Sequence, residues 1–383
     1  MDFDEAVAAG LIDWIGEDTL DRYIDAVAEQ SLGGGAAGDA KVVYTPLNGA
    51  GLECVTRILE RIGIEDVVVV PEQAEPDGNF PTCPYPNPEI REALQKGLEL
   101  CEDVHPDLLL ATDPDADRVG IAVPHGGEYV LLTGNEVGVL LLDFACRRRL
   151  ELGEGLDGKI AITTIVSTAM VDALARDFDI ELRRTLTGFK YIGEQIGMLE
   201  EVGEEGRFIF GFEESYGYLA GSAVRDKDAI VASMLICEMA AWHKAAGRDL
   251  VDAMDELYAR YGRYGNRTLN FQYPGADGAA RMKELMTGLR ENSPAEVADL
   301  PVTAVVDYAP GAPMPILNGD GAAQVLPEAN VIEFQVGEGN KLIVRPSGTE
   351  PKIKAYLFAH ADTLDEMNAL LDAIAKTASE LLG

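Results

Sequence analysis

The chain has 383 residues, enough for two or three domains that each bury a core of their own. Apolar residues make up 47% and charged residues 25%, but 31 Lys and Arg against 66 Asp and Glu give a net charge of −35. Such a surface repels nucleic acids and anionic membranes, so we expect neither as a partner.

The N-terminal residues and the cysteines predict the compartment. The opening "MDFDEAVAAG" lacks the basic and then apolar regions of a signal peptide, and the most apolar window, "VGVLLLDFAC", is too short to cross a bilayer. Five scattered cysteines, never spaced as C-x-x-C, argue against a disulfide framework or a zinc site. We therefore expect a cytoplasmic protein.

Strands and helices alternate in the first part of the chain, after a helix predicted by its apolar spacing. Between two of these elements, residues 75–89 hold five prolines and must form an extended loop. The predicted elements are a helix at 19–30, strands at 41–47, 66–70 and 108–112, and helices at 51–63 and 90–101. This alternation is typical of an α/β domain.

The alternation restarts after "TGNE", where Asn135 is a plausible helix cap. Helices at 137–150, 168–178, 191–200 and 226–246 are predicted to alternate with strands at 159–166, 181–186 and 207–212. From residue 262 several strands follow one another, which indicates an antiparallel sheet with helices. The predicted fold is therefore two α/β mixed-sheet domains, residues 18–134 and 135–261, followed by a C-terminal α+β domain, residues 262–383.

The stretch "LLLATDPDADRVGIAV" places three carboxylates directly after an apolar strand. Asp113, Asp115 and Asp117 repel one another unless a positive charge neutralises them. Hard divalent cations such as Mg²⁺ bind carboxylate oxygens, whereas a solvated acidic turn would not need apolar strands on both sides. An EF-hand is excluded because the twelfth position from Asp113 is Pro124. The pattern predicts a magnesium site.

A second motif, "VRPSGTEPKIK", predicts a phosphate-binding turn. A strand ends at Arg345, and the following turn offers hydroxyl and backbone N–H groups suited to a phosphate. A plain hairpin turn would explain the proline and the glycine. It would not explain a cluster of cations and hydroxyls in so acidic a chain: Arg345, Ser347, Thr349, Lys352 and Lys354.

Two weaker motifs also end predicted strands, where ligands bind in α/β proteins. "GFEESYGY" offers the carboxylate of Glu213 and the hydroxyl of Ser215, which could bind sugar hydroxyls. "TGFKYIGEQI" places Lys190 at a strand-to-helix turn, where a cation could meet phosphate or assist proton transfer. Each motif alone is also compatible with an ordinary solvated turn.

Together these motifs resemble the α-D-phosphohexomutases, most closely the phosphoglucomutase and phosphopentomutase branch. The resemblance rests on five motifs in the family's order, with "YTPLNGAG" and "NFPTCPYPNPE" as further marks: "TDPDADRVG", "TGFKYIG", "GFEESYGY", "RDKD" and "RPSGTEPKIKAY". It implies a carbohydrate-metabolism isomerase that interconverts sugar 1- and 6-phosphates by intramolecular phosphotransfer. The implied cofactors are Mg²⁺ and glucose 1,6-bisphosphate, and the implied partner is a sugar phosphate.

The resemblance also assigns roles to residues. Asp113, Asp115 and Asp117 would hold Mg²⁺, Arg118 would lie beside a phosphoserine, and Lys190 would lie near the transferring phosphoryl group. The substrate would be bound by Glu213, Ser215, Arg225, Lys227, Arg345, Ser347, Gly348 and Thr349. The form "EESYG" favours glucose or pentose phosphate over mannose phosphate.

One departure from the family is large. Its phosphoserine lies in a first domain, in a Thr-Ala-Ser-His-Asn-Pro type loop, and none of the four histidines here directly follows a serine. Ser167 and Thr168 match a structural strand end instead. The chain thus resembles domains two to four, with residues 1–17 a remnant of the first domain, its natural covalent neighbour. We expect little or no mutase activity from this chain alone.

Two alternatives stay open at this point. "DADRV" superficially satisfies an Asp-x-Asp-x-Val signature, so a haloacid-dehalogenase-type phosphatase would use Asp115 as nucleophile and Asp117 as acid. The later sugar and phosphate motifs would then be unexplained. The other alternative is a sugar-phosphate-binding fragment or module without catalysis.

Overall fold

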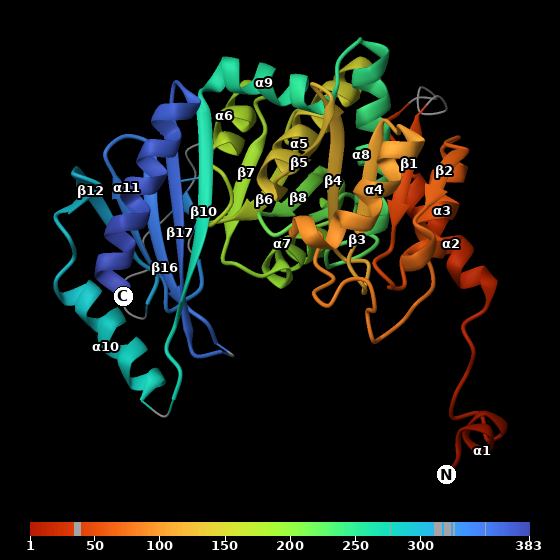
Figure 1. The fold of residues 1–383 in the computed structure, drawn as a ribbon, viewed down its shortest axis with the longest axis horizontal. Coiled ribbons are helices and arrows are strands. Elements are labelled where there is room, and N and C mark those ends of the chain that lie inside the picture. The colour runs from red at the N-terminus through yellow and green to blue at the C-terminus, as the bar shows by residue number, and fades with distance from the viewer. Residues whose placement is uncertain (34–39, 276, 310–315, 318–322, 325, 349) are drawn as a thin grey trace.

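The structure is a computed structural model that describes residues 1–33, 40–275, 277–309, 316–317, 323–324, 326–348 and 350–383. Figure 1 shows the sheets side by side in chain order, from the red N-terminal region through the green middle region to the blue C-terminal region. The two mixed sheets and the C-terminal antiparallel sheet confirm the predicted fold class.

The first sheet has the strand order β2-β1-β3-β4-β5. Its strands are β1 (Lys41–Thr45), β2 (Asp66–Val69), β3 (Leu108–Thr112), β4 (Val119–His125) and β5 (Glu128–Leu132). β1 pairs in parallel with β2 and β3, whereas β4 runs antiparallel to β3 and β5. Its helices are α2 (Glu17–Ala28), α3 (Leu52–Arg61) and α4 (Gln95–Val104). The proline-rich residues 75–89 lie outside these helices and strands, as predicted.

The second sheet has the order β7-β6-β8-β9. Its strands are β6 (Ile160–Thr164), β7 (Glu181–Thr185), β8 (Phe208–Glu213) and β9 (Gly217–Leu219). β6 is parallel to β7 and β8, and β9 is antiparallel to β8. Its helices are α5 (Gly134–Glu151), α6 (Met170–Asp177), α7 (Phe189–Glu201), α8 (Ala229–Ala245) and α9 (Leu250–Tyr261).

Helix α8 joins these two units through a shared core. It is apolar nearly all round, and most of its side chains are buried, as expected for a helix enclosed by other elements. It contacts α3 of the first unit as well as α5 and β9 of the second. One continuous apolar cluster therefore runs from β1 to β8, which fixes the strand ends of both sheets relative to each other.

The C-terminal sheet is antiparallel, in the order β10-β17-β16-β15-β12-β11. Its strands are β10 (Arg263–Gln272), β11 (Glu296–Val297), β12 (Leu300–Asp307), β15 (Ile332–Val336), β16 (Asn340–Pro346) and β17 (Lys352–Ala361), beside α10 (Gly278–Glu291) and α11 (Leu364–Leu382). A small cluster that includes Ile165, Leu186, Ile343, Tyr356 and Phe358 packs this sheet against the second unit.

Two sequence predictions were incomplete or wrong. Helix α9 was not predicted, although Asp249 caps it by accepting hydrogen bonds from the N–H groups of Val251 and Asp252. The predicted cap of α5 was wrong. Thr133 is the cap, because its hydroxyl and the Glu136 carboxylate bond each other's backbone N–H groups, whereas Asn135 lies in the first turn.

Within the described ranges, no single helix is long and apolar enough to cross a membrane. Helices α8 and α9 would reach that length and composition only as a pair bent by 83°.

Candidate active site

Three aspartates form a compact carboxylate cluster directly after β3. The strand is buried along its whole length, so the chain leaves it at the carboxyl edge of the sheet. One oxygen from each of Asp113, Asp115 and Asp117 lies within 4.8 Å of the other two. A set of carboxylate oxygens at this spacing fits a hard divalent cation such as Mg²⁺.

The electrostatics of the cluster favour a bound cation. Burial, together with the negative charges of Asp117 and Asp115, raises the pKa of Asp113 to about 7. The backbone N–H groups of Asp117 and Arg118 donate to Oδ1 of Asp113 at 3.0 and 2.9 Å and oppose that rise. A divalent cation would remove the mutual repulsion of the carboxylates.

Two basic side chains face the same cluster. Nε of Arg118 lies 3.7 Å from Oδ1 of Asp117, and Nζ of Lys227 lies 2.9 Å from its Oδ2. Among the described residues, the buried Nε of Arg118 has no hydrogen-bond partner. Burial disfavours the charged form of Lys227, but the hydrogen bonds to Asp117 and Asp226 raise its pKa. Both cations are placed to meet an anionic ligand at the aspartates.

The metal loop, residues 113–118, is held by the second α/β unit. Ala116 has a left-handed backbone with φ 55°, and its carbonyl accepts a hydrogen bond from the N–H of Ala229 at 3.1 Å. Tyr216, with φ 65°, accepts from the N–H of Val119 at 3.1 Å. A left-handed conformation costs a non-glycine residue on the order of 1 kcal/mol. These cross-domain hydrogen bonds offset that cost and fix the loop against the β8–β9 turn.

Glu213 ends β8 and lies close to the same cations. Its Oε1 accepts a hydrogen bond from the N–H of Gly188 at 2.8 Å, which ties β8 to the turn before α7. Burial raises the pKa of Glu213, and the charges of Lys227 and Arg118 partly offset this rise. The carboxylate is therefore held near the metal loop with one oxygen already engaged by the backbone.

The other predicted site residues of the second unit do not all face the aspartate cluster. Ser215 is half-buried in the β8–β9 turn, and Lys190 is exposed, with its ammonium 4.8 Å from the centre of the Tyr191 ring. Arg225 points to α7, where its guanidinium pairs with Glu200 at 2.7 Å. The structure therefore brings Lys227 to the aspartates but directs Arg225 away from them.

The hydroxyl of Ser167 belongs to a structural strand end, in line with its sequence context. It is buried and lies 3.0 Å from the hydroxyl of Thr164. The backbone carbonyl of Ser167 also accepts a hydrogen bond from the buried guanidinium of Arg184 at 3.4 Å.

The predicted phosphate-binding turn lies at the tip of the β16–β17 hairpin. Ser347 closes the turn, because its N–H donates to the carbonyl of Lys352 at 2.8 Å and its hydroxyl accepts from the N–H of Glu350 at 3.2 Å. Arg345 is half-buried, and its guanidinium makes a long 3.5 Å contact with the hydroxyl of Tyr356. Gly348 is exposed, and Thr349 lies outside the described residues.

The hairpin also reaches the other two domains. The positive charge of Lys354 lowers the pKa values of Glu89 and Glu214, which burial raises. Glu89 ends the proline-rich loop and lies 3.6 Å from the guanidinium of Arg118. Residues of all three domains therefore meet around Arg118 and Lys354.

Sequence reasoning missed three residues of this region. Glu89 carried one signal, the dense prolines before it, which suggested an ordered loop. Thr187 precedes the Gly-Phe-Lys motif, and among the described residues its buried hydroxyl has no hydrogen-bond partner. Burial and the charge of Glu213 raise the pKa of Glu214 to about 8, a result of packing that no sequence pattern would show.

Three family models match most of the chain. Their descriptions are "Phosphoglucomutase/phosphomannomutase, alpha/beta/alpha domain II" over residues 21–127, "Phosphoglucomutase/phosphomannomutase, alpha/beta/alpha domain III" over residues 133–261, and "Phosphoglucomutase/phosphomannomutase, C-terminal domain" over residues 285–377. These matches decide against the haloacid-dehalogenase-type phosphatase.

Sequence relatives agree with these models. The chain is 38% identical over 328 residues to a phosphoglucomutase of Staphylococcus epidermidis and 36% identical over 338 residues to one of Staphylococcus aureus. These alignments cover 85% and 88% of this chain but only 59% and 60% of the relatives. The chain thus spans less than two thirds of the length of these relatives.

Solved structures share the fold. A putative phosphomannomutase from Thermus thermophilus matches with a TM-score of 0.64 at 22% identity, covering 94% of this chain and 66% of that one. Parafusin, a phosphoglucomutase from Paramecium, matches with a TM-score of 0.65 at 19% identity, covering 94% and 61%. From the family models, the sequence relatives and this shared fold, we conclude that the chain belongs to the phosphoglucomutase/phosphomannomutase family and carries its domains II, III and IV.

Proposed function

We propose that this chain forms the metal-, sugar- and phosphate-binding parts of a phosphoglucomutase-type enzyme. Such an enzyme interconverts a sugar 1-phosphate and a sugar 6-phosphate through a sugar bisphosphate. The observation that carries this proposal is that three domains meet at one place. Lys227 of the second unit lies 2.9 Å from Asp117 of the first, and the positive charge of Lys354 from the C-terminal domain lowers the pKa values of Glu89 and Glu214. Carboxylates for a cation, cations for phosphate and a buried carboxylate for sugar hydroxyls lie together there.

Each group has a role in this proposal. Asp113, Asp115 and Asp117 would hold Mg²⁺, which when bound neutralises negative charge on a phosphoryl group. Arg118 has a buried Nε that is free to donate to a phosphoryl oxygen, because none of the described residues accepts from it. Lys227 lies across the same cluster and would hold a second phosphoryl oxygen.

The sugar and its second phosphate would bind farther from the metal loop. Glu213 keeps one oxygen on the N–H of Gly188, so its other oxygen is oriented to accept from a sugar hydroxyl, with Ser215 beside it. Arg345 and the turn after it would bind the phosphate that is not reacting, as charge-assisted donors. After the first transfer the bisphosphate would turn round, so that its two phosphates exchange places.

This chemistry needs a phosphoryl donor. In the family the donor is a phosphoserine followed by histidine, and none of the four histidines in these 383 residues directly follows a serine. We therefore expect the chain alone to bind sugar phosphate without turning it over. Glucose 1,6-bisphosphate would then bind as the intermediate but would not start a cycle.

Calorimetry and a turnover assay on the same preparation test the proposal. We expect glucose 1-phosphate to bind in the presence of Mg²⁺, more tightly than mannose 1-phosphate, and to give no glucose 6-phosphate when catalytic glucose 1,6-bisphosphate is added. Failure to bind either sugar phosphate would contradict the proposed function. Robust turnover would show that a phosphoryl donor exists within the chain. A module without catalysis would bind equally but stay inactive with a phosphoserine domain added in trans.

A further inference from the structure

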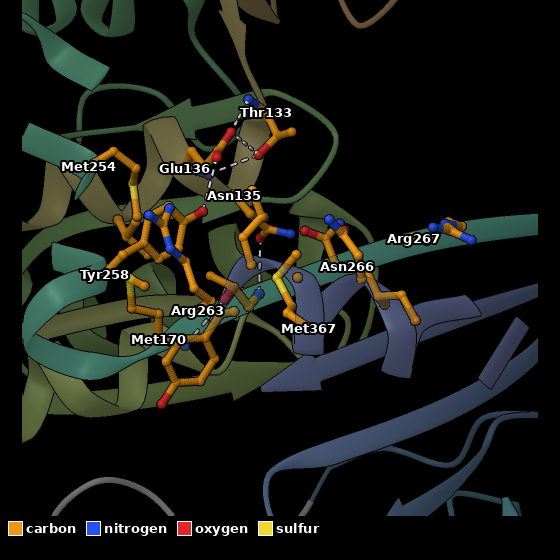
Figure 2. A pocket seen from close by; sticks show the side chains of 17 residues that line it. Thr133, Asn135, Glu136, Met170, Met254, Tyr258, Arg263, Asn266, Arg267 and Met367 are labelled. Carbon is orange, nitrogen blue, oxygen red and sulfur yellow. Dashed lines mark hydrogen bonds between the residues drawn. The ribbon is translucent and has the colours of Figure 1, made fainter. Parts of the chain in front are cut away.

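A cavity of about 430 Å³ lies between the second α/β unit and the C-terminal domain. One side is formed by the first turn of α5, by the start of α6 and by the middle and last turn of α9. The other side is formed by β10 and α11 (Figure 2). Its described lining shares no residue with the candidate active site. The cavity therefore needs an explanation of its own.

Asn135 leaves an unpaired donor in this cavity. The residue is only 4% exposed, and its Oδ1 accepts a hydrogen bond from the N–H of Thr168 at 3.0 Å. Among the described residues, its Nδ2 has no hydrogen-bond partner. Figure 2 shows the side chains of Asn135, Asn266 and Met367 pointing toward one another from three elements. A buried donor without an acceptor is destabilising, so a ligand that offers an acceptor here would bind favourably.

The other polar groups of the lining favour an anion. Glu136 is the one acid among the described lining residues, and its oxygens already accept from the hydroxyl of Tyr258 at 3.0 Å and from the N–H and hydroxyl of Thr133 at 2.7 and 2.8 Å. Arg263 and Arg267 contribute two positive charges to the lining. The described lining thus contains two guanidinium groups and one carboxylate that is already hydrogen-bonded.

The two arginines also keep donors available. The guanidinium of Arg263 lies 4.3 Å from the centre of the Tyr258 ring and pairs with Asp255 at 3.0 Å, and that of Arg267 pairs with Asp372 at 2.8 Å. Each described pair occupies one nitrogen, whereas a guanidinium has five N–H donors. Stacking on Tyr258 fixes the plane of Arg263, so its remaining donors point in defined directions.

We propose that this cavity binds a small organic anion, a carboxylate or a phosphate ester. One anionic oxygen would accept from Nδ2 of Asn135, and others would accept from the arginines. The carbon atoms of the ligand would lie against Met170, Met254 and Met367, whose flexible thioethers adapt to different shapes.

Binding at this cavity would connect two parts of the molecule. A ligand that contacts both Asn135 on α5 and Arg267 on β10 holds the C-terminal domain against the second unit. Asn135 also follows Gly134, which packs so closely on the β8–β9 turn that an added Cβ would lie 2.2 Å from the carbonyl oxygen of Glu214. An anion bound here is therefore one residue away from the turn that contains Glu213 and Ser215.

The test uses citrate as the carboxylate probe, glycerol 2-phosphate as the phosphate probe and trimethyl citrate as the uncharged control. All titrations are made without sugar phosphate on the full chain carrying Arg345→Gln, so that the candidate phosphate turn does not contribute. We expect at least one anion to bind and to raise the melting temperature, and trimethyl citrate to do neither. The anion that binds more tightly identifies the carboxylate or phosphate class.

Two further substitutions locate the binding. Asn135→Asp keeps the acceptor for the N–H of Thr168 but replaces the free donor with a carboxylate oxygen. Arg267→Gln removes one charge from a partly exposed side chain and should leave folding intact. Each should weaken anion binding about tenfold or more, as expected for one charge-assisted hydrogen bond.

The proposal is overturned if neither anion binds at millimolar concentration, if trimethyl citrate binds as tightly as citrate, or if Asn135→Asp binds the anions unchanged. If circular dichroism shows that Asn135→Asp does not fold, Arg267→Gln decides alone, and an unchanged dissociation constant overturns the proposal. The outcome is independent of the proposed function, because no sugar phosphate is present.

Discussion

The metal loop and the candidate phosphate turn, at the tip of the β16–β17 hairpin, are held in place in different ways. The metal loop, residues 113–118, accepts hydrogen bonds from the N–H groups of Ala229 and of Ala50 in the loop after β1, and the adjoining Val119 donates to the carbonyl of Tyr216. The phosphate turn is closed by hydrogen bonds within its own hairpin, and Gly348 at its tip is exposed. The metal loop is thus held by other parts of the fold, whereas Ser347 of the phosphate turn forms hydrogen bonds within its own hairpin.

This difference agrees with what each part is proposed to do. Three carboxylates need rigid support, because they would otherwise move apart to reduce their repulsion. A phosphate clasp that must bind either phosphate of a reorienting sugar gains from an exposed tip such as that at Gly348. The comparison predicts that substitutions under the metal loop affect stability, and that substitutions in the phosphate turn affect binding only.

The largest effect is expected from Gly49→Ala. An added Cβ at Gly49 would lie 2.3 Å from Cα of Pro114, so the metal loop would have to shift. We expect a loss of about 2–3 kcal/mol in the free energy of unfolding, together with weaker stabilisation by Mg²⁺. Urea denaturation with and without Mg²⁺ measures both. Gly78→Ala is the matched control, because nothing lies within 4 Å of its added Cβ. Equal stability of the two variants would contradict rigid support of the loop.

A smaller effect, on binding alone, is expected from Arg345→Gln. The described contact of its guanidinium is the long one to Tyr356, so the free energy of unfolding should change little. Affinity for glucose 1-phosphate should fall about tenfold or more, because a charge-assisted hydrogen bond is lost. Isothermal titration calorimetry measures this. Arg281→Gln, on the exposed face of α10, should leave affinity unchanged. A stability loss as large as that of Gly49→Ala would remove the contrast between the two regions.

A third effect is on the pH dependence of stability and concerns Glu214, which lies between these two regions. Burial raises its pKa from 4.5 to about 8, so between these pH values the folded state binds more protons than the unfolded state. Stability should therefore fall as pH rises through this window, by up to about 1.4 kcal/mol per pH unit, and the loss is complete above pH 8. Glu214→Gln should reduce this slope, most clearly above pH 7, because Asp113, with a pKa of about 7, contributes a slope of the same sign below that pH. The exposed substitution Glu128→Gln should leave the slope unchanged. Thermal melts at several pH values measure this slope. Identical slopes for Glu214→Gln and Glu128→Gln would contradict the raised pKa of Glu214.

Most strands and the order of the motifs could be predicted from the sequence, because apolar periodicity and turn residues are local signals. The aspartate cluster could also be predicted, since residues spaced two apart after one strand must lie close. The approach of Lys227 to Asp117 and of Lys354 to Glu89 could not, because these contacts depend on how the three domains pack.

Two differences between the predicted and the observed helices remain, the cap of α5 and the presence of α9, and each has a local cause. Thr133 and Asn135 are both good helix caps, and the reciprocal bonds of Thr133 with Glu136 decided between them. Helix α9 begins only a few residues after α8, so its capping aspartate, Asp249, was overlooked as part of a loop.

The aspartates and the sugar-phosphate groups should form one site. Mn²⁺ in place of Mg²⁺ tests it directly, through its paramagnetic effect on the ³¹P signal of bound glucose 1-phosphate. We predict strong relaxation of this signal, which is lost in Asp115→Asn although the sugar phosphate still binds. A sugar phosphate that binds while its ³¹P signal stays unaffected by Mn²⁺ at the aspartates would contradict the account.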